Sequence, residues 1–114
     1  MSFGYLSLGF GSFPSRFSPA IFGPRGLAMG GTGSGGKVNI IEFITIATTG
    51  NATDFGDLTS GGYYMSSCAN GIRGVIGGGS FNALDYVTIQ TTGNASTFGN
   101  LSVGRAETAA TSGD

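Results

Sequence analysis

The sequence predicts an all-β protein built from two similar units, and three observations support this fold class. Residues 42–58 recur without a gap as residues 85–101, 43 positions further along. In both copies Val, Ile, Thr and aromatic residues, which favour strands, alternate with a period of two. Turn residues interrupt these runs, and no stretch shows the apolar spacing of a helix. A gapless repeat of this length indicates repeated β units within one chain.

The units span about residues 24–61 and 62–105, and each is expected to contain short strands separated by turns rich in Gly, Asn and Ser. Residues 25–31 match residues 73–79. The first unit has a longer loop at 32–37, which absorbs the difference in spacing and is expected to be flexible. The strands expected in the second unit are residues 63–69, 73–77, 83–91 and 97–103.

Two Thr-Thr-Gly-Asn-Ala segments, at 48–52 and 91–95, predict tight turns because Gly and Asn adopt positive φ readily. Sequons begin within them at Asn51 and Asn94, and a third begins at Asn100. No export signal is evident, so we interpret these segments as turns rather than as glycosylation sites.

The composition argues against several functional classes. Glycine accounts for 23 of the 114 residues and charged residues for only 10%, well below the roughly 25% of ordinary soluble domains. The net charge is −1 with no basic run, which argues against nucleic-acid binding. No apolar run is long enough to span a membrane or to form a signal peptide, so we expect synthesis in the cytoplasm without a signal peptide. A surface of Ser, Thr, Asn and Gly suits a protein that packs against copies of itself or lies outside a cell.

Residues that carry chemistry are few, and we predict neither an enzyme nor a metal or cofactor site. The chain has no histidine and one cysteine, Cys68, which we interpret as a small buried residue. Asp54 and Asp57 are replaced by Thr and Asn in the second copy, which argues against a calcium loop. Glu42 and Asp85 occupy equivalent positions, which indicates a structural bond to a neighbouring unit rather than acid–base catalysis.

Two arginines, Arg25 and Arg73, recur at the same position of the two units. We expect a structural role at a strand end; lining a central channel or binding an acidic group is the alternative. The glycine run at 30–36 lacks the Gly-Lys-Ser/Thr ending of a phosphate-binding loop.

The order of motifs in each unit resembles a kelch-type β-propeller blade. The second unit shows it as Gly78-Gly79, Asp85-Tyr86-Val87, Phe98-Gly99-Asn100-Leu101 and Arg105. The first unit shows it as Gly30-Gly31, Glu42-Phe43-Ile44 and Phe55-Gly56-Asp57-Leu58. The two phenylalanines stand where kelch repeats usually have Trp. The resemblance covers residues 24–114 and implies four-stranded propeller blades. Galactose-oxidase-type propellers share these repeats, but the copper ligands of that enzyme include histidine, which is absent here.

The repeat also resembles repeats of environmental and marine-phage proteins that serve as fibre or tail components. This resemblance implies a structural role in a virion or extracellular particle, as a fibre, tail or decoration protein. A helical extracellular filament is one alternative. The other is a carbohydrate-binding propeller, similar to small two-blade lectins that trimerise, with a glycan receptor bound between blades.

The register of the repeat predicts that a strand is exchanged between chains. Residues 105–114 align with residues 62–71, which contain the expected first strand of the second unit, whereas the first unit has no such strand in phase ahead of residue 24. We expect residues 106–114 to complete the first blade of a neighbouring copy, head to tail. Three copies and six blades is the arrangement we favour, within the four to eight blades of known propellers; a contact that does not close gives a helical filament. The candidate exchange residues are Ala106, Thr108 and Ala110.

Residues 1–23 lie outside the repeat and are rich in aromatic residues between Gly and Ser. We predict an extended apolar arm, packed on a neighbouring subunit or on a larger virion scaffold, because so apolar a segment is unfavourable in water. A disordered leader is the alternative. The candidate assembly residues of the arm are Phe3, Tyr5, Phe10, Phe13, Phe17 and Phe22.

Overall fold

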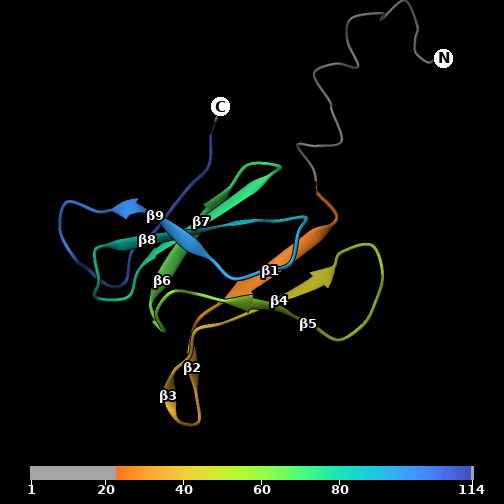
Figure 1. The fold of residues 1–114 in the computed structure, drawn as a ribbon, viewed down its shortest axis with the longest axis horizontal. Helices are drawn as coiled ribbons and strands as arrows, with labels where there is room; N and C mark the ends of the chain where they lie inside the picture. The colour runs from red at the N-terminus through yellow and green to blue at the C-terminus, as the bar shows by residue number, and fades with distance from the viewer. Residues whose placement is uncertain (1–22, 114) are drawn as a thin grey trace, which may run out of the picture.

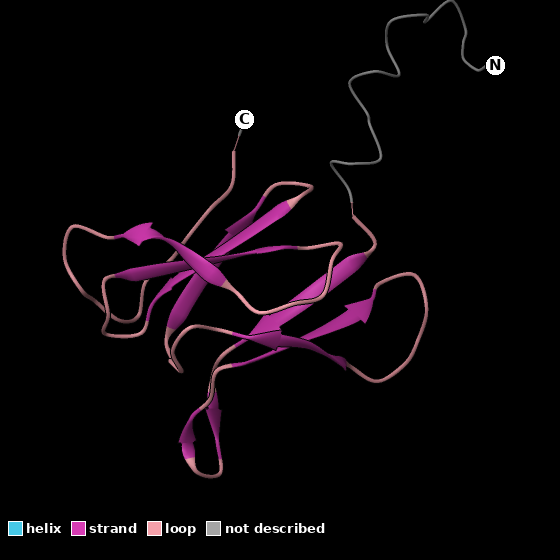
Figure 2. Ribbon diagram, viewed as in Figure 1, coloured by secondary structure: helices cyan, strands magenta, loops and turns pink. Residues whose placement is uncertain are grey.

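The computed structural model describes residues 23–113, and this part of the chain is all-β. Figures 1 and 2 show two antiparallel sheets and a small hairpin joined by loops. The all-β class predicted from the sequence is therefore confirmed. Within the described residues, no helix is long and apolar enough to cross a membrane.

The first sheet belongs to the first unit and has three strands in the order β1-β4-β5. Strand β1 (Arg25–Met29) pairs with β4 (Ile40–Thr45), and β4 pairs with β5 (Thr53–Asp57), all antiparallel. In the described part of the chain, the other edge of β1 has no strand partner.

The loop between β1 and β4 forms an ordered hairpin rather than the flexible loop expected at residues 32–37. Strand β2 (Thr32–Gly33) pairs with β3 (Gly36–Lys37). Gly36 has a φ of 110°, a conformation that glycine adopts without steric cost, and it allows the chain to reverse within two residues.

The second sheet belongs to the second unit and has four strands in the order β6-β7-β8-β9, each antiparallel to the next. Each of the four strands predicted from the sequence is present, but three of them are shorter than predicted. Strand β8, for example, ends at Thr88 rather than at residue 91, because Thr91 donates its N–H to the Thr88 carbonyl and closes a turn. The strands are β6 (Met65–Ala69), β7 (Arg73–Gly78), β8 (Ala83–Thr88) and β9 (Ser96–Asn100).

Irregular features of the backbone recur in both units. The register between strands shifts between Ile41 and Glu42 in the first sheet and between Leu84 and Asp85, 43 residues later, in the second. Such bulges bend a strand and increase its twist. The double glycines at 30–31 and 78–79 all have positive φ. The sequence repeat is thus also a repeat of local backbone structure.

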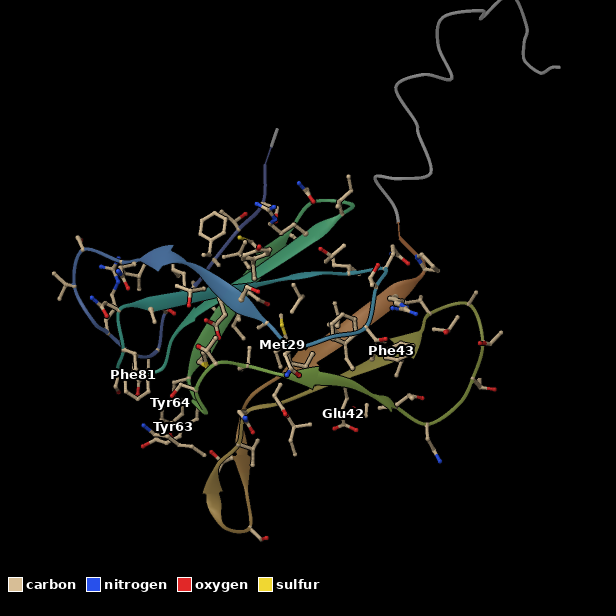
Figure 3. All side chains as sticks on the ribbon, in the orientation of Figure 1. Met29, Glu42, Phe43, Tyr63, Tyr64 and Phe81 are labelled. Atoms are coloured by element: carbon tan, nitrogen blue, oxygen red, sulfur yellow. The ribbon has the colours of Figure 1, made fainter. Side chains whose placement is uncertain are left out.

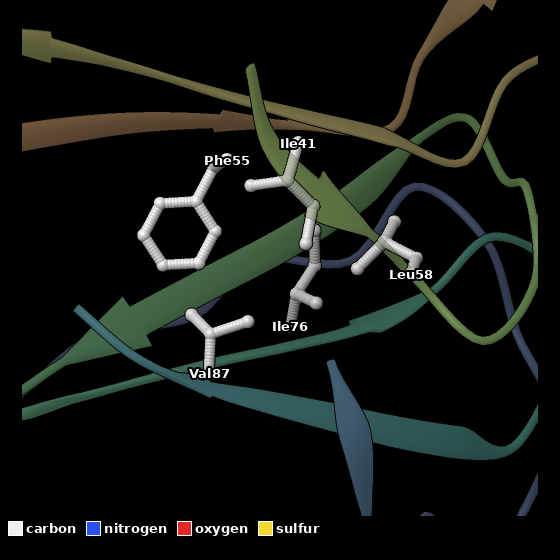
Figure 4. Close-up of a cluster of buried hydrophobic side chains, with 5 residues drawn as sticks. All are labelled: Ile41, Phe55, Leu58, Ile76 and Val87. Atoms are coloured by element: carbon white, nitrogen blue, oxygen red, sulfur yellow. The ribbon is translucent and has the colours of Figure 1, made fainter. Parts of the chain in front are cut away.

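The core lies between the two sheets (Figure 4). Ile41, Phe55 and Leu58 from the first unit face Ile76 and Val87 from the second. Strand residues alternate between the two faces of a sheet, so each sheet turns one face towards this core and the other face away from it. We call this packing the intersheet contact.

The core predicts different effects for two equivalent phenylalanines. Phe55 is 2% exposed, whereas Phe98, 43 residues later, is 50% exposed. Phe55→Ala should lower the free energy of unfolding by about 3–5 kcal/mol, because it leaves a cavity in the intersheet contact. The matched control Phe98→Ala should change it by less than about 1 kcal/mol in the isolated chain. Urea unfolding at low protein concentration measures both values; equal losses would contradict the assignment of the core.

Candidate assembly interface

Polar bonds reinforce the intersheet contact. Asp85 of β8 is buried, and Thr59, just after β5, donates its backbone N–H to Oδ2 of Asp85 over 2.8 Å. The Thr59 hydroxyl lies 2.8 Å from both carboxylate oxygens. Arg25 of β1 donates from Nη1 to the Ile89 carbonyl over 3.1 Å and stacks on the Phe43 ring at 4.3 Å. Each of these hydrogen bonds joins one unit to the other.

The turn after β8 covers the outer edge of β5. Gly93 and Ala95 donate their N–H groups to the carbonyls of Phe55 and Asp57, both over 2.8 Å. Asn94 Oδ1 accepts the N–H of Asp57 over 3.0 Å. This pairing satisfies backbone groups that an open sheet edge would leave unpaired.

The face of the first sheet that points away from the core repeats the apolar pattern of the contact. Ile44 and Ile46 are 45% and 64% exposed, whereas their equivalents Val87 and Ile89 are 3% and 7% exposed. Figure 3 shows Glu42, the exposed equivalent of Asp85, on this sheet. We call the face formed by Ala28, Glu42, Ile44 and Ile46 the first outer face.

The second sheet also leaves one face uncovered, which we call the second outer face and define by Val75, Leu84, Phe98 and Leu101. These residues are the equivalents of Leu27, Ile41, Phe55 and Leu58, which line the intersheet contact. A cavity of about 410 Å³ lies between this face and the C-terminal residues, and Val75, Leu84 and Leu101 line it. The first outer face thus corresponds to the side of the intersheet contact that the second unit provides, and the second outer face corresponds to the side that the first unit provides. In a single chain neither outer face is packed against its matching side.

The path by which the C-terminal tail, residues 105–113, leaves the second unit is similar to the path by which the chain leaves the first unit. The Gly62 carbonyl accepts the N–H of Gly31 over 2.7 Å, and the Arg105 carbonyl, 43 residues later, accepts the N–H of Ser80 over 3.1 Å. Both bonds fix the exit of the chain beside a double glycine. A Cβ on Gly78 would lie 2.7 Å from the Thr108 hydroxyl, so glycine is needed for this close approach.

The tail also repeats the backbone conformation that precedes β6. Tyr64 has a φ of 57° and Glu107, 43 residues later, has a φ of 54°. Positive φ is uncommon outside glycine, so its recurrence at equivalent positions shows that the two segments follow the same local path.

The tail lies beside β6 of its own chain without forming a strand with it. Glu107 donates its N–H to the Tyr64 carbonyl over 3.0 Å, and the Ser66 and Thr108 hydroxyls are 2.7 Å apart. Further along, Ser112 Oγ accepts the N–H of Ala69 over 2.9 Å. The tail and β6 therefore run parallel to each other, like neighbouring strands that belong to two different sheets.

The structure locates only some of the residues predicted from the sequence as an assembly site. Arg25 lies in the intersheet contact, whereas its equivalent Arg73 is exposed and stacks on the Tyr86 ring at 4.5 Å. The tail contains Ala106, Thr108 and Ala110, and all three line the cavity between the tail and the second outer face. Phe3, Tyr5, Phe10, Phe13, Phe17 and Phe22 lie outside the described residues.

The sequence reasoning missed the residues of both outer faces. The signal was present, because Ile44 aligns with Val87 and Phe98 with Phe55. Which face of a strand is buried, however, depends on how the two sheets pack. The same alternating pattern of residues is compatible with burial of either face.

An aromatic cluster lies where the β2–β3 hairpin meets the second unit. The Lys37 amino group lies 5.0 Å from the centroid of the Tyr63 ring and 4.7 Å from that of Phe81. Tyr64 packs edge-on against Tyr63 and is 60% exposed, and Phe81 is 42% exposed. Figure 3 shows the three rings together. The repeat does not duplicate this cluster, since Ala106 and Glu107 occupy the positions equivalent to the two tyrosines.

No protein-family model matches this chain, and no curated protein matches its sequence. The kelch-type resemblance therefore stays a prediction from the motifs. Within residues 23–113, no group of three or more His, Cys, Asp or Glu side chains is placed to hold a metal ion.

The polar bonds across the intersheet contact predict unequal roles for the two equivalent carboxylates. Asp85→Ala should lower the free energy of unfolding by about 2 kcal/mol, because it removes charge-assisted hydrogen bonds from Thr59. Glu42→Ala should change the stability of the isolated chain by less than about 0.5 kcal/mol, because Glu42 is exposed. Chemical denaturation of dilute samples compares the two variants, and a larger loss for Glu42→Ala would refute the assignment.

Proposed function

We propose that this protein is a non-enzymatic structural protein whose copies assemble head to tail. In this assembly the tail of one copy adds the missing strand to the first sheet of the next, so that the first sheet becomes, like the second, a four-stranded, kelch-like propeller blade. The result is a closed ring or an open fibre, depending on whether the rotation between copies closes.

The observation that carries this proposal is the path of the tail. At the exit from the second unit, the tail accepts a hydrogen bond at the equivalent carbonyl, from a donor one position further along, and has a similar positive φ to the segment that enters β6. The tail therefore begins along the same local path as the segment that leads into β6, but the described residues contain no strand paired with it. Of the two larger sheets in this part of the chain, the one with the free edge of β1 has three strands and lacks such a strand.

The repeat gives the register of the exchanged strand. Within the second sheet, Ser67 pairs with Ile76 and Ala69 with Gly74. Moving each residue to its equivalent pairs Ala110 of one copy with Ala28 of the next, and Ser112 with Gly26. These residues are small, so the two backbones approach without steric conflict.

The finer parts of the proposal have separate support. The ring of six blades from three copies rests on the kelch resemblance and on the usual number of blades. The place in a virion or other extracellular particle rests on the phage-like repeat and on the apolar segment 1–23, of which residues 1–22 are not described.

Glycan binding is a second candidate function, and the aromatic cluster beside Lys37 is the observation that favours it. Exposed aromatic rings next to hydrogen-bond donors provide stacking surfaces for sugars, as for other planar or apolar groups. Among the described residues the cluster occurs once, and the proposed contacts between copies do not involve it, so it is available as a receptor site.

Glycan binding is tested by replacing the two exposed rings. If the cluster binds sugar, a glycan array should give binding that Tyr64→Ala and Phe81→Ala each reduce at least about tenfold, a loss of 1.4 kcal/mol or more. Tyr86→Ala, at a ring outside the cluster, serves as the control. An array without binding, or binding that both cluster variants retain, would exclude this function.

The exchange of strands is tested by cross-linking two populations of the 114-residue chain, both carrying Cys68→Ser. One carries Ala28→Cys and the other Ala110→Cys, so a short bis-maleimide gives a mixed dimer only through contact between chains. We expect a dimer of twice the 11.4 kDa chain mass, together with native masses at multiples of that value. Ala110→Cys mixed with the exposed Thr48→Cys is the control. A stable monomer without the mixed dimer would overturn the proposal.

A further inference from the structure

We infer that the contact between two copies repeats the intersheet contact residue for residue, with the first outer face of one copy seated on the second outer face of the next. This inference rests on the proposed head-to-tail assembly and deepens it by naming the bonds that hold and align the partners. The occupant of both faces is a second copy of this chain.

The apolar residues are the first step of the argument. Val87 packs against Phe55 and Leu58 in the intersheet contact. The equivalent residue on the first outer face is Ile44, and the equivalents on the second are Phe98 and Leu101. If the second copy follows the first as the second unit follows the first unit within a chain, Ile44 of the second copy packs against Phe98 of the first. This contact lies next to the cavity of about 410 Å³. It thereby removes from water the side chains that are 45% and 50% exposed in one chain.

The second step is a matched polar pair. Asp85 accepts hydrogen bonds from Thr59 in the intersheet contact. The equivalents are Glu42 on the first outer face and Ser102 after β9, and both are exposed. Glutamate is one methylene longer than aspartate, and serine is one methyl group smaller than threonine. The Glu–Ser pair between copies therefore fills the same space as the Asp–Thr pair within a chain.

The third step concerns the edge of the sheet. Gly93 and Ala95 pair with β5 in one chain, so Gly50 and Ala52 of a second copy would pair with the free edge of β9. Asn51 would then accept the N–H of Asn100, as Asn94 accepts that of Asp57.

Glycines give an independent sign of this pairing. A Cβ on Gly56 would overlap the Gly93 carbonyl, so the contact within the chain requires glycine there. Gly99 is the equivalent residue, and a Cβ on it would meet nothing within 4 Å in this chain. The Gly50 carbonyl of a second copy occupies that space in the inferred contact. Gly99 is thus placed to admit a neighbouring backbone.

The inference predicts that Gly99→Ala weakens assembly without affecting the fold of one chain. The φ of Gly99 lies outside the region that disfavours alanine, and open space surrounds it. Sedimentation across a concentration series should show at least about a tenfold increase in the dissociation constant between copies. Gly35→Ala, also in open space, should assemble as the unsubstituted chain does. Circular dichroism and thermal unfolding check that both variants fold.

Cross-linking gives a second measurement that does not depend on Gly99→Ala. Mixed Cys68→Ser chains carrying Asn51→Cys or Asn100→Cys should form a cross-linked dimer, because the inferred contact brings these two positions together. If the Ala28–Ala110 dimer forms but the Asn51–Asn100 dimer does not, or if Gly99→Ala assembles normally, the inference is wrong and strand exchange stands. If neither dimer forms, the inference and the proposed function fail together.

Discussion

The packing of one sheet on the other is the contact on which the rest of this structure depends. It joins unlike faces, because the first unit contributes the side of Phe55 and Leu58 and the second contributes the side of Val87 and Ile89. Two similar units joined by unlike faces always leave one face of each kind uncovered. The exposed Ile44 and Ile46 and the exposed Phe98 follow from this geometry rather than from a separate feature of the surface.

The same geometry relates the tail to the first sheet. The segment before β6 crosses from one unit to the next, and at the end of the second unit the tail repeats its positive φ and accepts a hydrogen bond at the equivalent carbonyl. Within residues 23–113, neither the tail nor the outer edge of β1 is paired with a strand. In the proposed exchange, the tail and the edge of β1 would pair with each other and gain hydrogen bonds.

The unusual glycine content has a structural explanation at several positions. Gly78 lies against the Thr108 hydroxyl, and Gly56 lies against the Gly93 carbonyl, so a side chain at either place would collide with a neighbouring segment. Glycine here allows backbones of adjacent units to approach closely, rather than giving flexible linkers. The few charged residues are used in a similar way, since Arg25 and Asp85 form hydrogen bonds between units.

The sequence by itself determined the all-β class, the repeat of two units and the approximate positions of the four strands of the second sheet, but not the β2–β3 hairpin, where a flexible loop was expected. These features follow from local rules, namely strand periodicity, turn residues and the 43-residue repeat. It also indicated that Glu42 and Asp85 share a structural role. Only the tertiary structure decided that Asp85 is bonded to Thr59 while Glu42 is exposed, and that Val87 is covered while Ile44 is not. The physical reason is that alternation along a strand defines two faces, whereas the packing of whole sheets selects which face is buried.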